Sequence, residues 1–486
     1  MSPVSAVGDA LPALLLVGEA LALAATGALA AAAIGVRGTA QFVLAAYLVV
    51  AAEVVVVSLA LSHRELVSRW PMAASVAGGL VVAVAVWTGR GRPPMPSMRR
   101  GMGLIMEAVR DPPLAVLAVA VALGMAYSLA LLLFTPQNGG DVLTYHLARA
   151  AFWKQHGGIY WIASANDTRL NPNPPNAELG QLFTLIASGS DRFVGLVQFL
   201  SLIALCVGIL AVARLLGIGV RGAVFGALVF AALPVVAMQA SAGLNDLAVA
   251  SFLLVAVVFA ISPGRSSPAL FALAVALALG TKMTAVLALP LLALVLVATH
   301  RGRQLATWAA YLLAGLVGGA YWYVVTFHES GSFDGGLKQG QVTDHSVSTV
   351  IATARLLVLG FLDLSGAIEL NIAVYPIVAL LMTLAALLIA VRRRWVSRAA
   401  ARGALLVAVV PLLLLPVGLA ITWAYQHGLL GLVPSDEPAA HQGWTVATTA
   451  GATSSWYGPV APFLLVSGTV LVVVAVRRRQ IGRAHV

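Results

Sequence analysis

The sequence predicts an all-α polytopic membrane protein, and three observations support this fold class. The chain has 486 residues, of which 60% are hydrophobic and only 10% are charged. Its mean hydropathy is +0.95. Its apolar residues gather in stretches of the length that a helix needs to cross a bilayer, roughly 20 residues. Because soluble domains carry about 25% charged residues, the composition excludes an ordinary soluble protein, a disordered chain and a fibrous protein.

The apolar stretches predict about 13 membrane-spanning helices. The predicted spans are 11–36, 41–61, 71–88, 113–134, 193–216, 221–238, 245–262, 268–281, 283–299, 304–327, 372–391, 404–424 and 459–476. The stretches 268–281 and 283–299 could instead form one long tilted helix, which would give 12 spans. The first stretch follows no basic segment and shows no clear cleavage site, so we expect a retained helix rather than a signal peptide.

The basic residues predict the orientation of these spans. One set of loops holds 20 of the 29 Lys and Arg residues and only two acidic residues, Glu107 and Asp111. Positively charged loops stay in the cytoplasm, which places the N-terminus outside and the C-terminus in the cytoplasm of a plasma-membrane protein. The formal net charge of +11 then reflects contact with anionic membrane lipids, and no nucleic-acid partner is expected.

Four parts are expected along the chain. They are an extra N-terminal three-helix module (1–90), a basic cytoplasmic linker (91–112), a transmembrane core (113–476) and a basic tail (477–486). The last six residues, IGRAHV, resemble a translated sequencing adapter, so we expect an artefactual end. The core contains three long outer loops, which are 135–192, 328–371 and 425–458. Long polar loops on one face commonly carry function.

The spacing of residues in the first outer loop predicts two surface helices. Apolar and polar residues recur with helical periodicity over 142–155, which predicts an amphipathic helix at the membrane interface. A second such helix is expected over 176–188, after the proline pair at 174–175. Asp141 directly precedes the first helix. Its carboxylate is either a catalytic group or an N-cap, because a helix N-terminus stabilises negative charge.

The first of these helices carries further candidate residues. His146 and Arg149 lie three residues apart and therefore share one face. His146 could act as a base, although an interfacial aromatic residue is the commoner role. Alternatively, four side chains of this loop could bind a divalent metal: Asp141, His146, Asp167 and Glu178. Their spacing matches no specific metal-binding pattern.

Other polar residues are expected at the same membrane face. Asn245 and Asp246 begin a predicted span, where they are either functional groups or helix caps. Lys282, one of only three lysines, lies between two apolar stretches and could bind a phosphate or extend to the membrane surface. Trp456 and Tyr457 precede the last predicted span, as membrane-interface anchors or as a wall of a sugar or lipid pocket.

Five sequence motifs follow the predicted span 113–134 along the chain. They are GGDVLTYHLARAAFW (139–153), NPNPPNAEL (171–179), SAGLNDLAVA (241–250), LALGTKMTAV (277–286) and SSWYGP (454–459). Together they resemble the bacterial integral-membrane glycosyltransferases of the C type, which are akin to protein O-mannosyltransferases and lipid A aminoarabinose transferases. The resemblance covers the core, 113–476, and not the three N-terminal spans. Gly243 and Leu244 stand where the family pattern would have a Thr-Gln pair.

The resemblance implies a specific reaction on the outer face of the membrane. Such enzymes pass a sugar from a polyprenyl-phosphate donor to an acceptor hydroxyl of a glycan, lipid or protein, and inversion at the anomeric carbon is expected. It implies that Asp141 is the general base or orients the acceptor, and that Arg149 and Lys282 stabilise the leaving phosphate. The remaining residues expected to bind substrate are Tyr145, His146, Glu178, Asn245, Asp246, Trp456 and Tyr457. No cofactor is required by this reaction, and a divalent metal remains an alternative.

Two other classes remain as alternatives. A transporter or flippase of a lipid-linked or small substrate would be expected to show paired, Gly- or Pro-interrupted helices and charges at the membrane midplane. Glu19 and Glu53 do lie inside predicted spans, but both belong to the N-terminal module. A non-enzymatic scaffold is the third class, and its function would not depend on Asp141.

Overall fold

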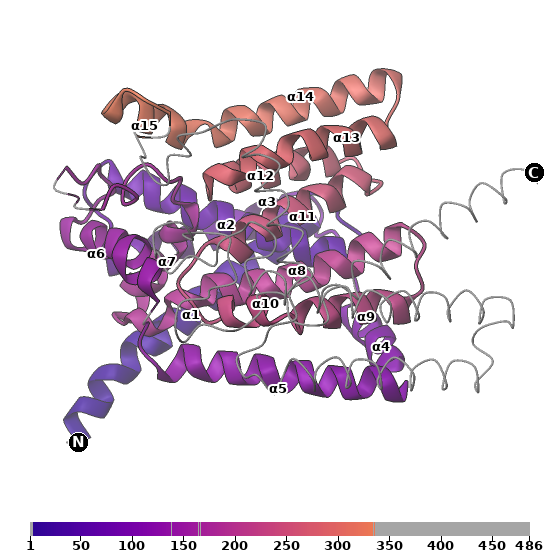
Figure 1. Ribbon diagram of the computed structural model, residues 1–486, viewed down its shortest axis with the longest axis horizontal. Helices are drawn as coiled ribbons and strands as arrows, with labels where there is room; N and C mark the ends of the chain where they lie inside the picture. The colour runs from indigo at the N-terminus through magenta and orange to yellow at the C-terminus, as the bar shows by residue number, and fades with distance from the viewer. Residues whose placement is uncertain (1–2, 138, 164, 166, 334, 336–486) are drawn as a thin grey trace, which may run out of the picture. The chain divides into compact units, whose positions relative to one another are not determined.

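A computed structural model describes residues 3–137, 139–163, 165, 167–333 and 335 (Figure 1). Within these residues every regular element is a helix, which confirms the predicted all-α class. Five helical segments are long and apolar enough to cross a membrane: α1 (Pro3–Ala33), α2 (Thr39–Ser62), α3 (Arg69–Gly89), α5 (Pro112–Phe134) and η2 with α8 (Asp191–Gly195, Leu196–Leu215). A sixth arises if α14 (Gly302–Gly319) and α15 (Tyr321–Ser330), bent by 41°, form one broken span. The fold is therefore compatible with a helical membrane protein.

Four further predicted spans are short apolar helices in the structure; three are shorter than predicted, and the fourth, 283–299, has the predicted bounds. Their helices are α9 (Val220–Ala231), α11 (Asp246–Ile261), α12 (Ser267–Leu279) and η3 with α13 (Met283–Ala288, Leu289–Thr299). The predicted span 221–238 is interrupted where α9 ends and α10 (Pro234–Gln239) begins, since proline cannot donate the backbone bond that would continue a helix. The last three predicted spans lie outside the described residues, so the total of 13 stays a prediction.

One hydrophobic core joins α2, α8, α11 and α12. Tyr47 on α2 links three of these helices, because its hydroxyl lies 3.0 Å from that of Ser201 on α8 and 2.8 Å from that of Ser251 on α11. Such hydroxyl contacts hold helices together where hydrophobicity alone does not distinguish protein from lipid. Where α14 crosses α12, a Cβ on Gly319 would lie 2.6 Å from the Cβ of Leu279, so only glycine permits this close approach.

A second hydrophobic core joins the N-terminal helices to the first outer loop. Its helices are α1, α2 and α3 together with η1 (Val142–His146), α6 (Leu147–His156) and α7 (Asn176–Ser188). The three N-terminal helices therefore belong to the same compact unit as the loop. This unit comprises Met1–Ala232 and Val236–Lys338. The predicted linker also contains a helix, α4 (Met98–Val109), whose N-terminus is capped by the Ser97 hydroxyl.

The predicted helix over 176–188 forms with those bounds as α7, but it is buried within the protein and has no broad solvated face. Every residue from Ala177 to Ser188 except Gly180 is buried within the protein. The polar side chains that suggested a solvated face instead find partners inside: Glu178 pairs with His146, and the Gln181 amide donates to the Gly243 carbonyl at 2.9 Å. Periodicity reveals a polar stripe, but it does not reveal what covers that stripe.

Candidate functional site

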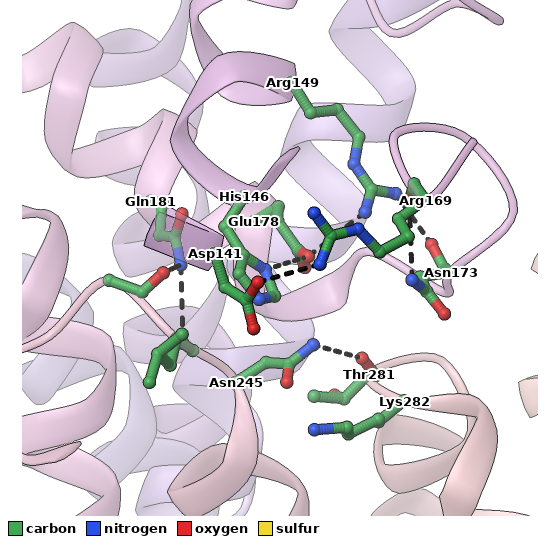
Figure 2. A network of polar contacts seen from close by, with 12 residues as sticks. Asp141, His146, Arg149, Arg169, Asn173, Glu178, Gln181, Asn245, Thr281 and Lys282 are labelled. Atoms are coloured by element: carbon green, nitrogen blue, oxygen red, sulfur yellow. Dashed lines mark hydrogen bonds and ion pairs between the residues drawn. The ribbon is translucent and has the colours of Figure 1, made fainter. Parts of the chain in front are cut away.

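Four of the five motif segments meet at one place in the structure (Figure 2). Gln137, just before the first motif, accepts a hydrogen bond from the Gly243 backbone N–H at 2.9 Å and donates to the Ser241 carbonyl at 3.2 Å. Gln181 on α7 holds the same turn through the Gly243 carbonyl. The segment before α11 is thus fastened to both the first outer loop and α7.

Two glycines permit these contacts. A Cβ on Gly243 would lie 3.0 Å from Val142 Cγ1, so the small residue brings the turn close to the start of η1. A Cβ on Gly280, at the end of α12, would lie 2.2 Å from the side-chain nitrogen of Asn176. The Asn176 backbone N–H also donates a hydrogen bond to the Gly280 carbonyl at 2.8 Å. Trp322 on α15 donates to the Asn176 side-chain oxygen at 2.9 Å and so closes this side.

A buried ion-pair network fixes α6 against α7. His146 Nδ1 and Glu178 Oε1 are 2.7 Å apart, and Arg149 Nη2 donates to the same oxygen at 3.2 Å. Arg149 also donates to the Asn173 carbonyl at 2.7 Å. His146 and Arg149 are each 1% exposed and Glu178 is fully buried. Burial alone would raise the pKa of Glu178, but the charges of Arg149 and His146 outweigh it and hold that pKa below its usual value.

A second, exposed network surrounds Asp141. Arg169 Nη1 lies 2.8 Å from Asp141 Oδ1, and Arg169 Nη2 lies 2.7 Å from Asp167 Oδ2. The same guanidinium lies over the Tyr145 ring, 4.6 Å from its centroid. The Asp141 side chain is 56% exposed. Asp141 makes no side-chain hydrogen bond to the helix that follows, so the N-cap interpretation is not supported by the geometry.

Arg169 is the residue that sequence reasoning missed. Its signal was present, because an aspartate stands two residues before it in an outer loop with few bases. Two hydrogen bonds from Arg169 to Asp167, one through Nε and one through Nη2, make the pair bidentate. The first cause of the lowered pKa of Asp167 is its side-chain hydrogen bonding to Arg169.

A third pair lies where α11 begins and α12 ends. Lys282 Nζ is 2.5 Å from Asp246 Oδ1, and the Asn245 side chain donates to the Thr281 carbonyl at 3.4 Å. Lys282 is therefore engaged by a carboxylate in the protein. The α11 N-terminus is capped at the Ala248 N–H by Gln198, which leaves Asn245 without a capping role. Asn245 is 3% exposed, and its side-chain oxygen has no partner among the described residues.

The phenol of Tyr145 lies within electrostatic range of carboxylates from all three networks. Burial is the main cause that raises the pKa of Tyr145, and the carboxylates of Asp141, Glu178 and Asp246 raise it further, while Arg169 opposes them. One phenol thus feels charges from three networks. Figure 2 shows Asp141 on one side of this region and Asn245 and Lys282 on the other. The arrangement offers an exposed carboxylate and two partly exposed cations to a polar ligand.

The four residues considered as a metal site do not come together. His146 and Glu178 form the buried pair, whereas Asp141 and Asp167 face the guanidinium of Arg169. Among the residues that the structure describes, no group of three or more His, Cys, Asp or Glu side chains could hold a metal ion. The other expected residues, Trp456 and Tyr457, lie outside the described residues.

In the part of the chain that the structure describes, the fold is all-helical with several candidate membrane spans, and a polar, mixed-charge site lies at the ends of its helices. Comparisons with family models, with curated proteins and with solved structures gave no match to this chain. The resemblance to C-type glycosyltransferases therefore rests on the motif residues, and the function follows as a proposal from the site.

Proposed function

We propose that this protein is a membrane glycosyltransferase that moves a sugar from a polyprenyl-phosphate donor to an acceptor hydroxyl at the outer face of the membrane. The observation that carries the proposal is the Asp141 carboxylate. It is exposed, forms no side-chain capping hydrogen bond to a helix, and is held in place by Arg169. A polar site at helix ends, next to apolar helices that lipid could reach, suits a substrate with a charged head and a prenyl tail.

The chemistry follows from the positions of these groups. The acceptor hydroxyl attacks the anomeric carbon and transfers its proton to Asp141, whose Oδ2 is not engaged by Arg169. The bond between the anomeric carbon and the phosphate oxygen breaks, and the lipid phosphate leaves with the bonding electrons. A single displacement inverts the anomeric configuration and needs no second carboxylate as nucleophile.

The exposure of each cationic side chain decides whether it can contact the donor phosphate. Arg149, expected to meet the phosphate, is 1% exposed and paired with Glu178. We assign it, with His146 and Glu178, the role of positioning the helix that begins after Asp141. Arg169 and Lys282 have side chains that are 22% and 29% exposed, so they can reach a phosphate.

The test is transfer by the purified full-length protein in lipid nanodiscs, given a radiolabelled polyprenyl-phosphate sugar and an acceptor extract from a bacterial envelope. Asp141→Asn should reduce turnover by about 10²–10⁴-fold, the usual contribution of a general base. Asp191→Asn is the matched control, since Asp191 lies outside the site at the start of η2 and should leave turnover within about twofold.

Equal turnover of the wild type and Asp141→Asn would exclude this mechanism. The same protein, reconstituted into sealed vesicles, distinguishes a glycosyltransferase from a transporter. Movement of the labelled lipid or sugar across the bilayer with no covalent transfer to any acceptor would favour a transporter or flippase and overturn the proposal.

A further inference from the structure

A cavity of about 680 Å³ lies at the opposite ends of α11 and α12 from the Asp141 site. It is lined by 14 residues from the α1–α2 connection, the end of α8 and the α11–α12 connection, and none of them is acidic. With 16 residues in α11 and about 1.5 Å per residue, the cavity is separated from Asp246 by roughly 24 Å. It therefore takes no part in the chemistry proposed for Asp141.

Two arginines line this cavity, Arg37 and Arg265. Both are exposed, and neither forms a hydrogen bond or an ion pair with any residue in the described part of the chain. Every cation of the Asp141 site, by contrast, has a carboxylate partner. Two unpaired guanidinium groups on one cavity that has no acidic lining residue favour a negatively charged ligand.

Two helix N-termini add positive potential to the same cavity. α2 begins after Gly38 and α12 begins after Ser266, and both of these N-cap residues line the cavity. Gly38 has no side chain that could cap α2, and the Ser266 side chain forms no capping hydrogen bond to α12. The first backbone N–H groups of a helix and its dipole together favour an anion, most often a phosphate.

A buried hydroxyl provides an independent indication of a ligand. Ser262 lines the cavity at the end of α11 and is only 7% exposed. Its hydroxyl oxygen has no hydrogen-bond partner among the described residues. Buried polar groups in proteins nearly always have a partner. The oxygen itself is buried, and rotation of this short side chain toward the cavity would let it donate a hydrogen bond to a phosphate oxygen.

We propose that this cavity binds the phosphate group of an anionic ligand, held by Arg37, Arg265, Ser262 and the N-termini of α2 and α12. The volume is in the range of small-molecule sites, about 300–1,000 Å³. The phosphate can belong to the headgroup of an anionic phospholipid or to a free phosphate compound, and the two sources share this chemistry.

The test uses the full-length protein in a non-ionic detergent and ³¹P NMR titrations of two probes, dihexanoyl phosphatidylglycerol and inorganic phosphate. The wild type should bind at least one probe, and Arg37→Gln with Arg265→Gln should weaken that binding about tenfold or more. Binding of the lipid alone assigns a headgroup site, and comparable binding of inorganic phosphate assigns a free-phosphate site.

Two further double variants keep the result interpretable. Arg90→Gln with Arg303→Gln removes the same charge from exposed positions outside the cavity and should leave binding unchanged. Arg37→Lys with Arg265→Lys keeps the charge and should retain binding within about threefold, since lysine also binds phosphate. The proposal is overturned if the wild type binds neither probe, or if the control pair weakens binding as much as the cavity pair.

Discussion

The two ends of the α11–α12 helix pair differ in whether their cationic side chains are paired with carboxylates. At the end with Asp246 and Lys282, the cations are matched by carboxylates in ion pairs. At the end with Arg37 and Arg265, exposed cations line a cavity without an acidic residue. Paired charges preserve a fixed geometry before any ligand arrives, whereas unpaired charges of one sign make affinity depend on a ligand of the opposite sign. One helix pair thus supports a pre-organised polar site and an anion-binding cavity.

The largest expected effect concerns the buried network behind the paired end. Glu178→Gln leaves Arg149 buried without a counter-charge and should lower the free energy of unfolding by about 3–5 kcal/mol. Urea denaturation of the detergent-solubilised protein, followed by circular dichroism, measures this loss. Glu107→Gln, on the exposed face of α4, is the control and should change stability by no more than about 0.5 kcal/mol. Equal effects of both variants would show that the network does not stabilise this end.

A smaller effect is expected where the motif segments touch. Gly280→Ala places a Cβ against Asn176, whose amide is held by Trp322 and the α12 end, so the contact can be relieved only by a shift of packed groups. The expected destabilisation is about 1–3 kcal/mol. Gly124→Ala on α5 meets nothing within 4 Å and should be neutral or slightly stabilising. Urea denaturation of both variants tests this prediction. If Gly280→Ala left the free energy of unfolding unchanged, the close approach of Gly280 and Asn176 would be contradicted.

The smallest effect concerns the partly exposed pair of Asp167 and Arg169. Arg169 lowers the folded-state pKa of Asp167, so the pair stabilises the protein above the unfolded pKa, about 3.9, and this contribution is lost as pH falls through the lower folded value. Asp167→Asn should therefore cost less than about 1 kcal/mol at pH 7. Melting temperatures of variant and wild type should converge in acid. A difference in melting temperature that stays unchanged as the pH falls through the folded-state pKa of Asp167 would exclude this electrostatic origin.

The sequence predicted several local features of the candidate site well. Asp141 does precede a helix over much of 142–155, and α7 has the predicted bounds. Asn245, Asp246 and Lys282, placed on one face from the order of the predicted spans alone, do lie together. These predictions depend on helical periodicity and on breaks at glycine and proline, which are properties of short stretches of chain.

The roles of the arginines could not be read in the same way. Arg149 and Arg169 both lie in the first outer loop, and nothing in their neighbouring residues shows that one is buried and the other partly exposed. That difference arises because α7 packs beneath α6 and brings Glu178 to Arg149, while the 167–169 turn returns to Asp141. Contacts between distant segments decide burial, and burial decides which cation can meet a substrate.

The sequence by itself determined the all-helical class, the positions of most helix ends and the uneven distribution of charge along the chain, because hydropathy and propensity act locally. Only the tertiary structure decided which charges are paired. It buried α7, gave Asp141 an arginine partner in place of a capping role, and gathered Arg37 and Arg265 on one cavity. The physical reason is that ion pairing and burial depend on distances of a few ångströms between residues that lie up to hundreds of positions apart.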